Sequence, residues 1–418
     1  MADHDHGDPA GLVPVEEYLD LVARAIRPLP ASTVPLAEAL GGVVAEDVTA
    51  AVSLPPFDNS GMDGYAVVAS DVASASAASP VTLPVTAEIA AGDVGSYALA
   101  PGTAMKIMTG ARMPSGADAV VQVEWTDGGS SAVSVRRPVS AGTAVRFLGG
   151  DAKAGEVLLS AGTRLRPMHI AVAASAGRGS VLVRPRPRVV VLSTGDELIS
   201  PGDPLAPGQI WDSNSYMLAA LAREAGAGSV ARARVRDDVS GVLPAITSYL
   251  VEADLVITTG GVSMGGSHDV VKAALASLGA SRGSVSFTKV AMQPGMPQGF
   301  GVIDAVPIFT LPGNPVSAYV SFQLFVRPAL GLLQGCDDLR LPVTSAVLSA
   351  PVRSPSGRRS YLRGVLSSSR ASGSSVEPLT GQGSHQIASL GRANALIIVP
   401  ERETRMPAGA TVDVVVLP

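Results

Sequence analysis

Short apolar stretches alternate with turns rich in Gly and Pro along most of the chain, and their spacing changes from region to region. From Val15 to Ile26 apolar side chains recur at helical spacing, and Pro28 and Pro30 end the segment. From Val81 to Val139 the pattern changes to short alternating runs separated by Gly, Asp and Pro, which is typical of strands. The sequence therefore predicts an amphipathic helix near the N-terminus and a small β-rich domain after it.

Strand-like and helix-like segments alternate after the RPRPR run at Arg184 to Arg188, up to about Gly331. The predicted strands are Val189 to Leu192, Val230 to Val235, Leu255 to Thr258 and Ile308 to Leu311. The predicted helices lie near Ser215 to Ala225, Leu243 to Glu252, Val270 to Leu278 and Val316 to Leu332. This alternation predicts a parallel α/β domain. After Leu341 the pattern returns to strands, which predicts a C-terminal β domain. The expected fold class is α/β plus β in several domains, since 418 residues exceed what one core usually organises.

Composition narrows the classes of protein. The apolar fraction is 46%, yet no uninterrupted apolar run reaches the roughly 18 residues that span a bilayer, so no membrane association is expected. The acidic start MADHDHGDPAG lacks the features of a secretory signal, which makes the cytoplasm the expected compartment. A net charge of -5 and an aromatic content of 4% argue against a nucleic-acid partner. Cys336 is the only cysteine, which excludes an intrachain disulfide.

Three loops follow predicted strands, and the carboxyl ends of parallel strands share one rim where ligands collect. They read STGDE from Ser193, TTGGVSMGGSHD from Thr258 and LPGNP from Leu311. Glycines in the middle loop let backbone N–H groups turn inward, and Asn314 and Pro315 suit the N-cap and first position of a helix. These loops can hold an oxyanion. Alternatively, they are tight strand-to-helix turns with no ligand.

Five carboxylates converge on the same rim, and they are Asp196, Glu197, Asp237, Asp238 and Asp269. Acids beside an anion site suggest Mg²⁺, because a hard divalent cation can bridge carboxylate and phosphate oxygens. Asp237, Asp238 and Asp269 could instead be helix caps. A hydrolase is the other alternative, since Gly261 to Gly265 matches GxSxG with Ser263 as nucleophile and His385 as base. The loop is longer and richer in glycine than a nucleophile elbow.

Six ordered blocks of the sequence resemble one known family. They are LPPFDNSGMDGYAV at 54–67, IMTGARMPSGADAVVQVE at 107–124, STGDEL at 193–198, GQIWDSN at 208–214, DLVITTGGVSMGG at 254–266 and LPGNPVSA at 311–318. The chain resembles the molybdopterin molybdenumtransferases, the family of bacterial MoeA and the gephyrin E domain, nearly end to end. The resemblance implies a central molybdopterin-binding α/β domain in an elongated four-domain subunit. The expected boundaries are 12–53 with 140–184, 54–139, 185–335 and 336–418.

The resemblance also implies the chemistry. Such a protein binds adenylated molybdopterin, delivers molybdate to its dithiolene sulfurs and releases AMP, with Mg²⁺ or a similar divalent cation. It implies a homodimer whose active site lies between the α/β domain of one subunit and β elements of the other. Molybdopterin adenylyltransferase and apo-molybdoenzymes are further candidate partners. A scaffold that keeps the fold without catalysis is the competing class, and the intact set of acids argues against it.

The family's functional residues transfer to named positions of this sequence. The implied catalytic residues are Asp63, Thr109, Glu197, Asp237, Asp269, Pro312 and Pro315, with Glu197, Asp237 and Asp269 as metal ligands. The implied substrate-binding residues are Thr194, Gly195, Asp196, Gly260, Gly261, Ser263, Gly265, Lys289, Gly313, Asn314, Ser317 and Arg363. Gln293 and Met296 stand where relatives often carry lysines, and Lys289 and Arg363 are expected to supply the cations for molybdate instead.

Overall fold

The computed structural model describes residues 11–235, 239–260, 270–277, 280–336, 340–369 and 373–418. The chain divides into two compact units, which are considered one at a time. Unit 1 comprises Met1–Ser32, Gly41–Ala45 and Leu182–Pro418, and unit 2 comprises Thr33–Leu40 and Glu46–Val181.

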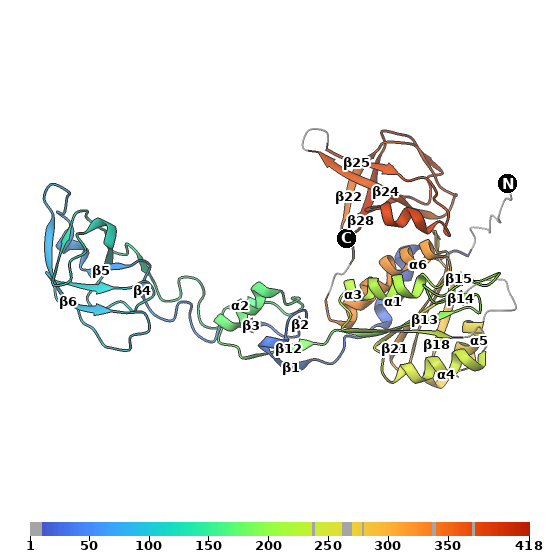
Figure 1. Cartoon of the computed structure of the whole chain (residues 1–418), viewed down its shortest axis with the longest axis horizontal. Helices are drawn as coiled ribbons and strands as arrows, with labels where there is room; N and C mark the ends of the chain where they lie inside the picture. Colours follow the sequence, from blue (N-terminus) through green and yellow to red (C-terminus); the bar gives the residue numbers. More distant parts are fainter. Residues whose placement is uncertain (1–10, 236–238, 261–269, 278–279, 337–339, 370–372) are drawn as a thin grey trace. The chain divides into compact units, whose positions relative to one another are not determined.

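A six-stranded sheet forms the centre of unit 1, in the order β16-β13-β17-β21-β20-β18 (Figure 1). Its strands are β13 (Arg188–Thr194), β16 (Ser229–Val235), β17 (Leu255–Thr259), β18 (Gly283–Lys289), β20 (Pro297–Ile303) and β21 (Val306–Leu311). The strands β16, β13, β17 and β21 are parallel, as predicted, with Val191 opposite Ile257 and Ile257 opposite Phe309. The last two, β20 and β18, are antiparallel and were not predicted. The expected fold class is confirmed, but its central sheet is mixed.

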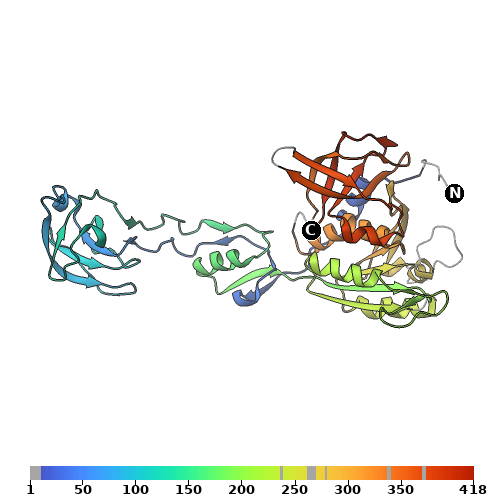
Figure 2. The ribbon, with the colours of Figure 1, turned by 45° about the horizontal axis from the view of Figure 1, so that its top comes forward.

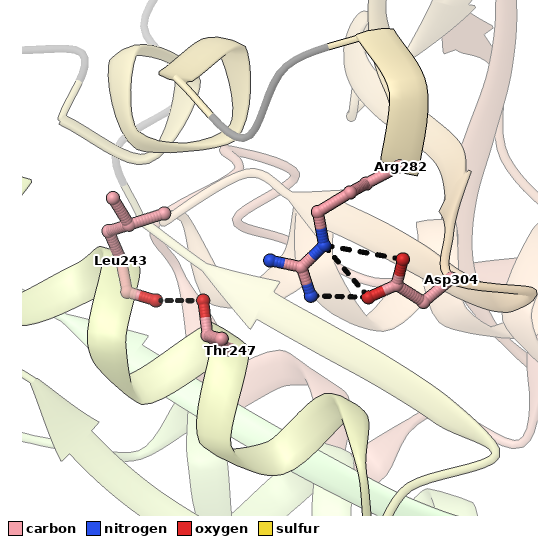
Figure 3. A network of polar contacts seen from close by, with 4 residues as sticks. All are labelled: Leu243, Thr247, Arg282 and Asp304. Carbon is pink, nitrogen blue, oxygen red and sulfur yellow. Dashed lines mark hydrogen bonds and ion pairs between the residues drawn. The ribbon is translucent and has the colours of Figure 1, made fainter.

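A two-residue hairpin turn explains the antiparallel edge. Asp304 and Ala305 join β20 to β21 with φ of 48° and 67°, the left-handed conformation that a tight hairpin turn requires. The Asp304 carboxylate accepts a hydrogen bond from Nε of Arg282 (3.0 Å). Figure 3 shows this pair beside Thr247, which donates to the Leu243 carbonyl within α4 (Val239–Leu250). Arg282 thereby lowers the pKa of the Asp304 carboxyl group.

Helices cover both faces of the sheet (Figures 1 and 2). They are α1 (Val15–Ala25), α3 (Asn214–Glu224), α4 (Val239–Leu250), α5 (Val270–Ser277), α6 (Pro315–Ser321), the π-helix η5 (Phe322–Val326) and α7 (Arg327–Leu333). Side chains of a strand alternate between faces. Val189 and Val191 accordingly join the core with α1, α3, α6 and α7, whereas Val190 and Leu192 join the core with α4 and α5.

The N-terminal helix α1 packs on unit 1. Val15, Tyr18 and Val22 lie on one stripe and are buried in the core with Phe325 and Val326 of η5. The sequence analysis grouped this helix with the N-terminal domain, but its apolar stripe finds its partners on the α/β domain.

The segment Pro315–Leu333 has the length and apolar composition of a membrane-spanning helix, and 78% of it is buried within the protein. A helix that is apolar on all sides can instead be surrounded by a protein core. Because α6, η5 and α7 contribute much of the core of unit 1, this burial accounts for their composition.

The C-terminal strands form a sheet that closes on itself, because β24 pairs with both β25 and β26. Its strands are β19 (Met292–Gln293), β22 (Val343–Leu348), β24 (Arg359–Ser369), β25 (Gly373–Pro378), β26 (Ala395–Val399) and β28 (Thr411–Val416). Smaller elements of unit 1 are β2 (Val43–Val44), β14 (Leu198–Ile199), β15 (Ile210–Trp211), η4 (Ala280–Arg282), β23 (Val352–Arg353), η6 (Ile387–Arg392) and β27 (Arg405–Met406). The predicted C-terminal β domain is confirmed.

Unit 2 contains a five-stranded sheet in the order β8-β5-β7-β6-β9. These strands are β5 (Gly64–Val67), β6 (Val81–Ile89), β7 (Ala104–Ile107), β8 (Ala119–Gln122) and β9 (Ala132–Val135). The other elements of the first 184 residues, apart from α1 and β2, are β1 (Ser32–Pro35), η1 (Leu36–Glu38), β3 (Val48–Thr49), β4 (Asn59–Ser60), η2 (Ala69–Val72), η3 (Val123–Trp125), β10 (Val145–Arg146), β11 (Val157–Leu159), α2 (Pro167–Ser175) and β12 (Ser180–Arg184). The β-rich region predicted from Val81 to Val139 is confirmed.

Candidate functional site

The loop after β13 brings one carboxylate to the carboxyl edge of the sheet. Thr194 ends the strand and is buried, and its hydroxyl has no hydrogen-bond partner within the described residues. Glu197 is exposed and lies close enough that a Cβ on Gly195 would stand 2.6 Å from its Oε2. The lack of a side chain at Gly195 therefore leaves room for the Glu197 carboxylate.

The loops after β17 and β21 meet beside Thr194. Gly260 has φ of +95°, and a Cβ there would lie 2.7 Å from the Thr194 carbonyl oxygen and 3.0 Å from its hydroxyl. The Cα of Gly260 is 3.6 Å from the position that a Cβ on Gly313 would take. Asn314 is the N-cap of α6 and Pro315 its first residue, which confirms that part of the prediction. The described parts of the three predicted loops, which for the middle loop end at Gly260, thus share one edge of the sheet.

We expect Gly260→Ala to destabilise the fold, because the substitution combines a left-handed backbone with a 2.7 Å approach to Thr194. A loss of about 2 kcal/mol in the free energy of unfolding is expected from such a change. Gly391→Ala is the matched control, since a Cβ at that position meets nothing within 4 Å. Urea denaturation of both variants measures the difference. Equal midpoints would contradict the predicted crowding at Gly260.

Two residues of the GQIWDSN block hold these loops together, although the sequence analysis did not select them. Nδ2 of Asn214 donates to the Gly313 carbonyl (2.7 Å) and to the Thr259 hydroxyl (3.0 Å). Asp212 is buried and accepts hydrogen bonds from the hydroxyl groups of Ser193 and Ser215, both at 2.7 Å. Because β13 and α3 both bond to Asp212, this carboxylate fixes the segment between them. The resemblance of the GQIWDSN block to the family was the sequence signal that could have identified Asp212 and Asn214.

The three loops enclose a cavity of about 330 Å³, which we name the strand-end cavity. It is lined by Thr194, Glu197, Leu198, Ile210, Trp211, Asp212, Ser213, Asn214, Thr259, Gly260, Gly313, Asn314, Pro315, His385 and Ile387. Five of the predicted site residues besides Glu197 line it, and they are Thr194, Gly260, Gly313, Asn314 and Pro315. The cavity therefore combines backbone turns suited to phosphate with apolar side chains.

A second cavity, of about 260 Å³, lies around Gly295, and we name it the Gly295 cavity. It is lined by Met292, Gln293, Pro294, Gly295, Met296, Pro297, Pro312, Asn314, Ser317, Arg358, Gln382, Gly383 and Ser384. Pro312 and Ser317 are predicted site residues. Asn314 lines both cavities and donates from Nδ2 to the Ser384 hydroxyl (3.0 Å). The two cavities are thus neighbours within unit 1.

The backbone of the Gly295 cavity is held from below by a buried side chain. Nε2 of Gln298 donates to the Gly295 carbonyl and to the Ser321 hydroxyl, both at 2.6 Å. Gly295 has φ of +103°, and a Cβ there would lie 2.9 Å from that hydroxyl. The turn that carries Gln293 and Met296 is therefore tightly anchored.

Arg363 lies behind the Gly295 cavity rather than on its surface. Its side chain has no exposed area, and Nη2 donates to the carbonyls of Gly381 and Gly383. Its Nε and Nη1 are buried without a hydrogen-bond partner among the described residues. Burial lowers the pKa of this guanidinium. Arg358, which the sequence analysis missed, lines the cavity directly.

The remaining predicted residues lie elsewhere. Lys289 ends β18, is exposed and is absent from the described lining of both cavities. Asp196 is exposed on the loop after β13. Asp237, Gly261, Ser263, Gly265 and Asp269 lie outside the described residues.

No group of three His, Cys, Asp or Glu side chains that could hold a metal occurs in the described ranges. Ser263 of the hydrolase alternative is thus outside them, whereas His385 lines the strand-end cavity.

Asp63 and Thr109 form a pair on unit 2. The Thr109 backbone N–H and its hydroxyl both donate to Oδ1 of Asp63 at 2.7 Å. These two bonds lower the pKa of the Asp63 carboxyl group, and the backbone N–H contributes more than the hydroxyl. A larger cavity of unit 2, about 480 Å³, is lined by Phe57, Tyr97 and Arg112 among others, and neither member of this pair lines it.

We expect Thr109→Val to raise the pKa of Asp63 only part of the way toward its ordinary value, because the backbone N–H still donates. A lowered carboxyl pKa contributes stability that is present above the pKa of the unfolded chain and is lost as the pH falls through the folded value. The Thr109→Val variant should lose this stability at a higher pH than the wild type does. An NMR titration measures the Asp63 pKa in the wild type and in the variant. An unchanged pKa would contradict the role of the Thr109 hydroxyl in lowering it.

The fold and the two cavities define a multidomain protein whose α/β domain carries two neighbouring cavities at the ends of its strands. Residues 13–177 match the MoeA N-terminal region (domain I and II), 190–331 a probable molybdopterin binding domain, and 345–417 the MoeA C-terminal region (domain IV).

Relatives share nearly the whole length. Molybdopterin molybdenumtransferase 2 of Mycobacterium tuberculosis is 46% identical over 96% of this chain and 98% of its own. Molybdopterin molybdenumtransferase of Bacillus subtilis is 36% identical over 97% of this chain and 94% of its own. The crystal structure of the molybdopterin biosynthesis MoeA protein from Pyrococcus horikoshii OT3 has a TM-score of 0.79 at 30% identity, covering 97% of this chain and 100% of that one. The chain belongs to the molybdopterin molybdenumtransferase family.

Proposed function

We propose that the protein inserts molybdate into adenylated molybdopterin and releases AMP. As a member of its family it is a transferase of molybdenum cofactor biosynthesis that acts on molybdopterin. The observation that carries the detailed proposal is the pair of neighbouring cavities in unit 1 that share Asn314. One suits a phosphorylated heterocycle and the other suits an oxyanion, so the two reactants can meet at their junction.

The Gly295 cavity is the proposed molybdate site. Arg358 and the Ser384 hydroxyl face it, and Arg363 stands behind the Gly381 to Gly383 backbone with two unpaired nitrogens in the part of the chain described. Arg358 can donate charge-assisted hydrogen bonds to an oxyanion, which are roughly twice as strong as neutral ones, and Arg363 adds positive charge from behind the cavity. These arginines can replace the cations missing at Gln293 and Met296. Lys289 keeps only an auxiliary role in this proposal.

The strand-end cavity is the proposed site of the phosphate groups and of one ring of the substrate. The turn at Gly313 before α6 is the proposed anion-binding segment, since the N–H groups of Gly260 and Val316 already donate to the carbonyls of Leu311 and Ser384. Thr194 lines it, and Gly195 and Asp196 follow Thr194 on the same loop. Pro312 and Pro315 fix the turn that presents Asn314. Gly261, Ser263 and Gly265 would complete the middle loop.

A divalent cation such as Mg²⁺ is part of the proposal. The exposed carboxylate of Glu197 lines the strand-end cavity, and oxygen ligands of this kind suit Mg²⁺. Asp237 and Asp269 are its proposed co-ligands. When bound, the ion would neutralise the charge of the pyrophosphate that is cleaved. In this proposal the Glu197 carboxylate holds the ion at the strand-end cavity.

Asp63 and Thr109 are proposed to complete the site from a second subunit of a homodimer. The Asp63 carboxylate stays ionised because Thr109 donates two hydrogen bonds to it. It can therefore orient water or substrate, while the Thr109 hydroxyl, whose one hydrogen is donated to Asp63, holds that carboxylate in place. We also propose the cytoplasm as the compartment, and molybdopterin adenylyltransferase and apo-molybdoenzymes as partners, without a nucleic acid or a membrane.

The decisive experiment incubates the purified protein with adenylated molybdopterin, Mg²⁺ and molybdate and measures AMP. Release of AMP that depends on molybdate is expected. Binding of adenylated molybdopterin without any AMP release would instead favour a non-catalytic scaffold. A parallel reaction with tungstate measures the preference between the two oxyanions.

A further inference from the structure

Three large apolar side chains are exposed at one cavity. Ile210, Trp211 and Ile387 line the strand-end cavity with 54%, 51% and 40% of their surface exposed. Exposing such groups to water is unfavourable. Their gathering at one cavity indicates a ligand with an apolar face.

The indole of Trp211 is held in place before any ligand binds. Its Nε1–H donates to the Asp203 carbonyl (2.9 Å), and its strand β15 pairs with β14, with Trp211 opposite Ile199. The next residue, Asp212, is buried and bonded to Ser193 and Ser215. A fixed aromatic ring loses little conformational entropy on binding. Trp211 is thus preorganised as a flat binding surface.

Besides the apolar side chains at Trp211, the strand-end cavity has turns that suit a phosphate. Thr194, Gly260 and Gly313 line the same cavity, with backbone turns at the strand ends. A ligand that fills the whole cavity therefore carries a planar ring next to phosphate oxygens. Both adenine and pterin, the two ring systems of the proposed substrate, meet that description.

We propose that Trp211 is the stacking platform for a planar nitrogen heterocycle of the nucleotide-activated substrate, and thereby a specificity-determining residue. The inference rests on the proposed function for the identity of the substrate. Stacking on the indole, with Ile210 and Ile387 at the edges, holds the ring while the strand-end turns bind the phosphate. Adenine and pterin share this chemistry, and binding of separate probes distinguishes them.

The test measures the affinity of the full-length protein for AMP and for hydroxymethylpterin by calorimetry. Trp211→Ala should weaken one probe by roughly 5- to 150-fold, the range for stacking of a base on an aromatic side chain. Trp211→Phe should stay within about threefold of the wild type, because it retains a ring. Weaker AMP binding assigns adenine to the platform, and weaker pterin binding assigns the pterin.

Trp125→Phe is the matched control, since Trp125 is the only other tryptophan and lies in unit 2. It should change neither affinity. A Trp211→Ala protein that binds both probes like the wild type overturns the proposal, as does a wild type that binds neither. These readouts need no turnover. Absence of molybdate-dependent AMP release would therefore refute the proposed function while the platform is still decided by binding.

Kinetics separate stacking from a merely structural role. In Trp211→Ala the KM for adenylated molybdopterin should rise by a similar factor while kcat stays within about threefold, as for loss of uniform binding. A fall in kcat together with a lower unfolding temperature would show that Trp211 supports the fold instead, and would overturn the proposal.

Discussion

Glu197→Gln is expected to lower the rate of AMP release by about 100-fold or more, the size of effect seen when one electrostatic contact to a transition state is removed. Glu197 is exposed and lines the strand-end cavity at the end of the loop after β13. The amide has almost the same shape but no charge, so it can neither hold a divalent cation nor balance one. The unfolding temperature should stay the same, because the exposed carboxylate supports no packing.

Glu403→Gln is the control for this experiment. Glu403 is also exposed and belongs to unit 1, but it lies in the connection between β26 and β27 and lines neither described cavity. It should keep wild-type turnover. If Glu197→Gln released AMP at the wild-type rate, with the same dependence on Mg²⁺, the role of this carboxylate in the mechanism would be refuted.

Arg363→Met is expected to weaken the binding of molybdate by about tenfold, because it removes a positive charge from behind the Gly295 cavity, and a nearby unit charge contributes about 1 kcal/mol or more. The guanidinium is fully buried, and two of its nitrogens lack partners within the described residues. Replacing a buried charge by an apolar side chain of similar volume is often neutral or stabilising. The loss of two bonds to Gly381 and Gly383 opposes that gain, so the unfolding temperature should change little.

Equilibrium binding of molybdate and thermal unfolding test this pair of outcomes. Arg353→Met is the control, since Arg353 is exposed on β23 in the same domain and lines neither described cavity. Arg363→Lys should recover only part of the affinity, because an ammonium lacks the planar fork of the guanidinium. A large drop in stability with unchanged molybdate affinity would show that Arg363 only supports the 381–383 backbone.

Part of the fold could be predicted because it depends on local pattern. Runs such as VVVL and LVIT are buried on both faces of a parallel sheet, and the helices between them have amphipathic spacing. Asn314 and Pro315 were predicted at a helix start because capping is a local property. The antiparallel strands β18 and β20 were not predicted, because their direction follows from the Asp304 turn and from pairing with β21.

The sequence by itself determined the order of the domains, the strand-end position of the loops and the family resemblance, since each depends on neighbouring residues. Only the tertiary structure decided which side chains meet. Asn214 bonds to Gly313, 99 positions away, and Asn314 bonds to Ser384, 70 positions away. Burial also turned Arg363 into a support behind its cavity and left Trp211 exposed. Such outcomes depend on packing between distant segments, which local spacing does not encode.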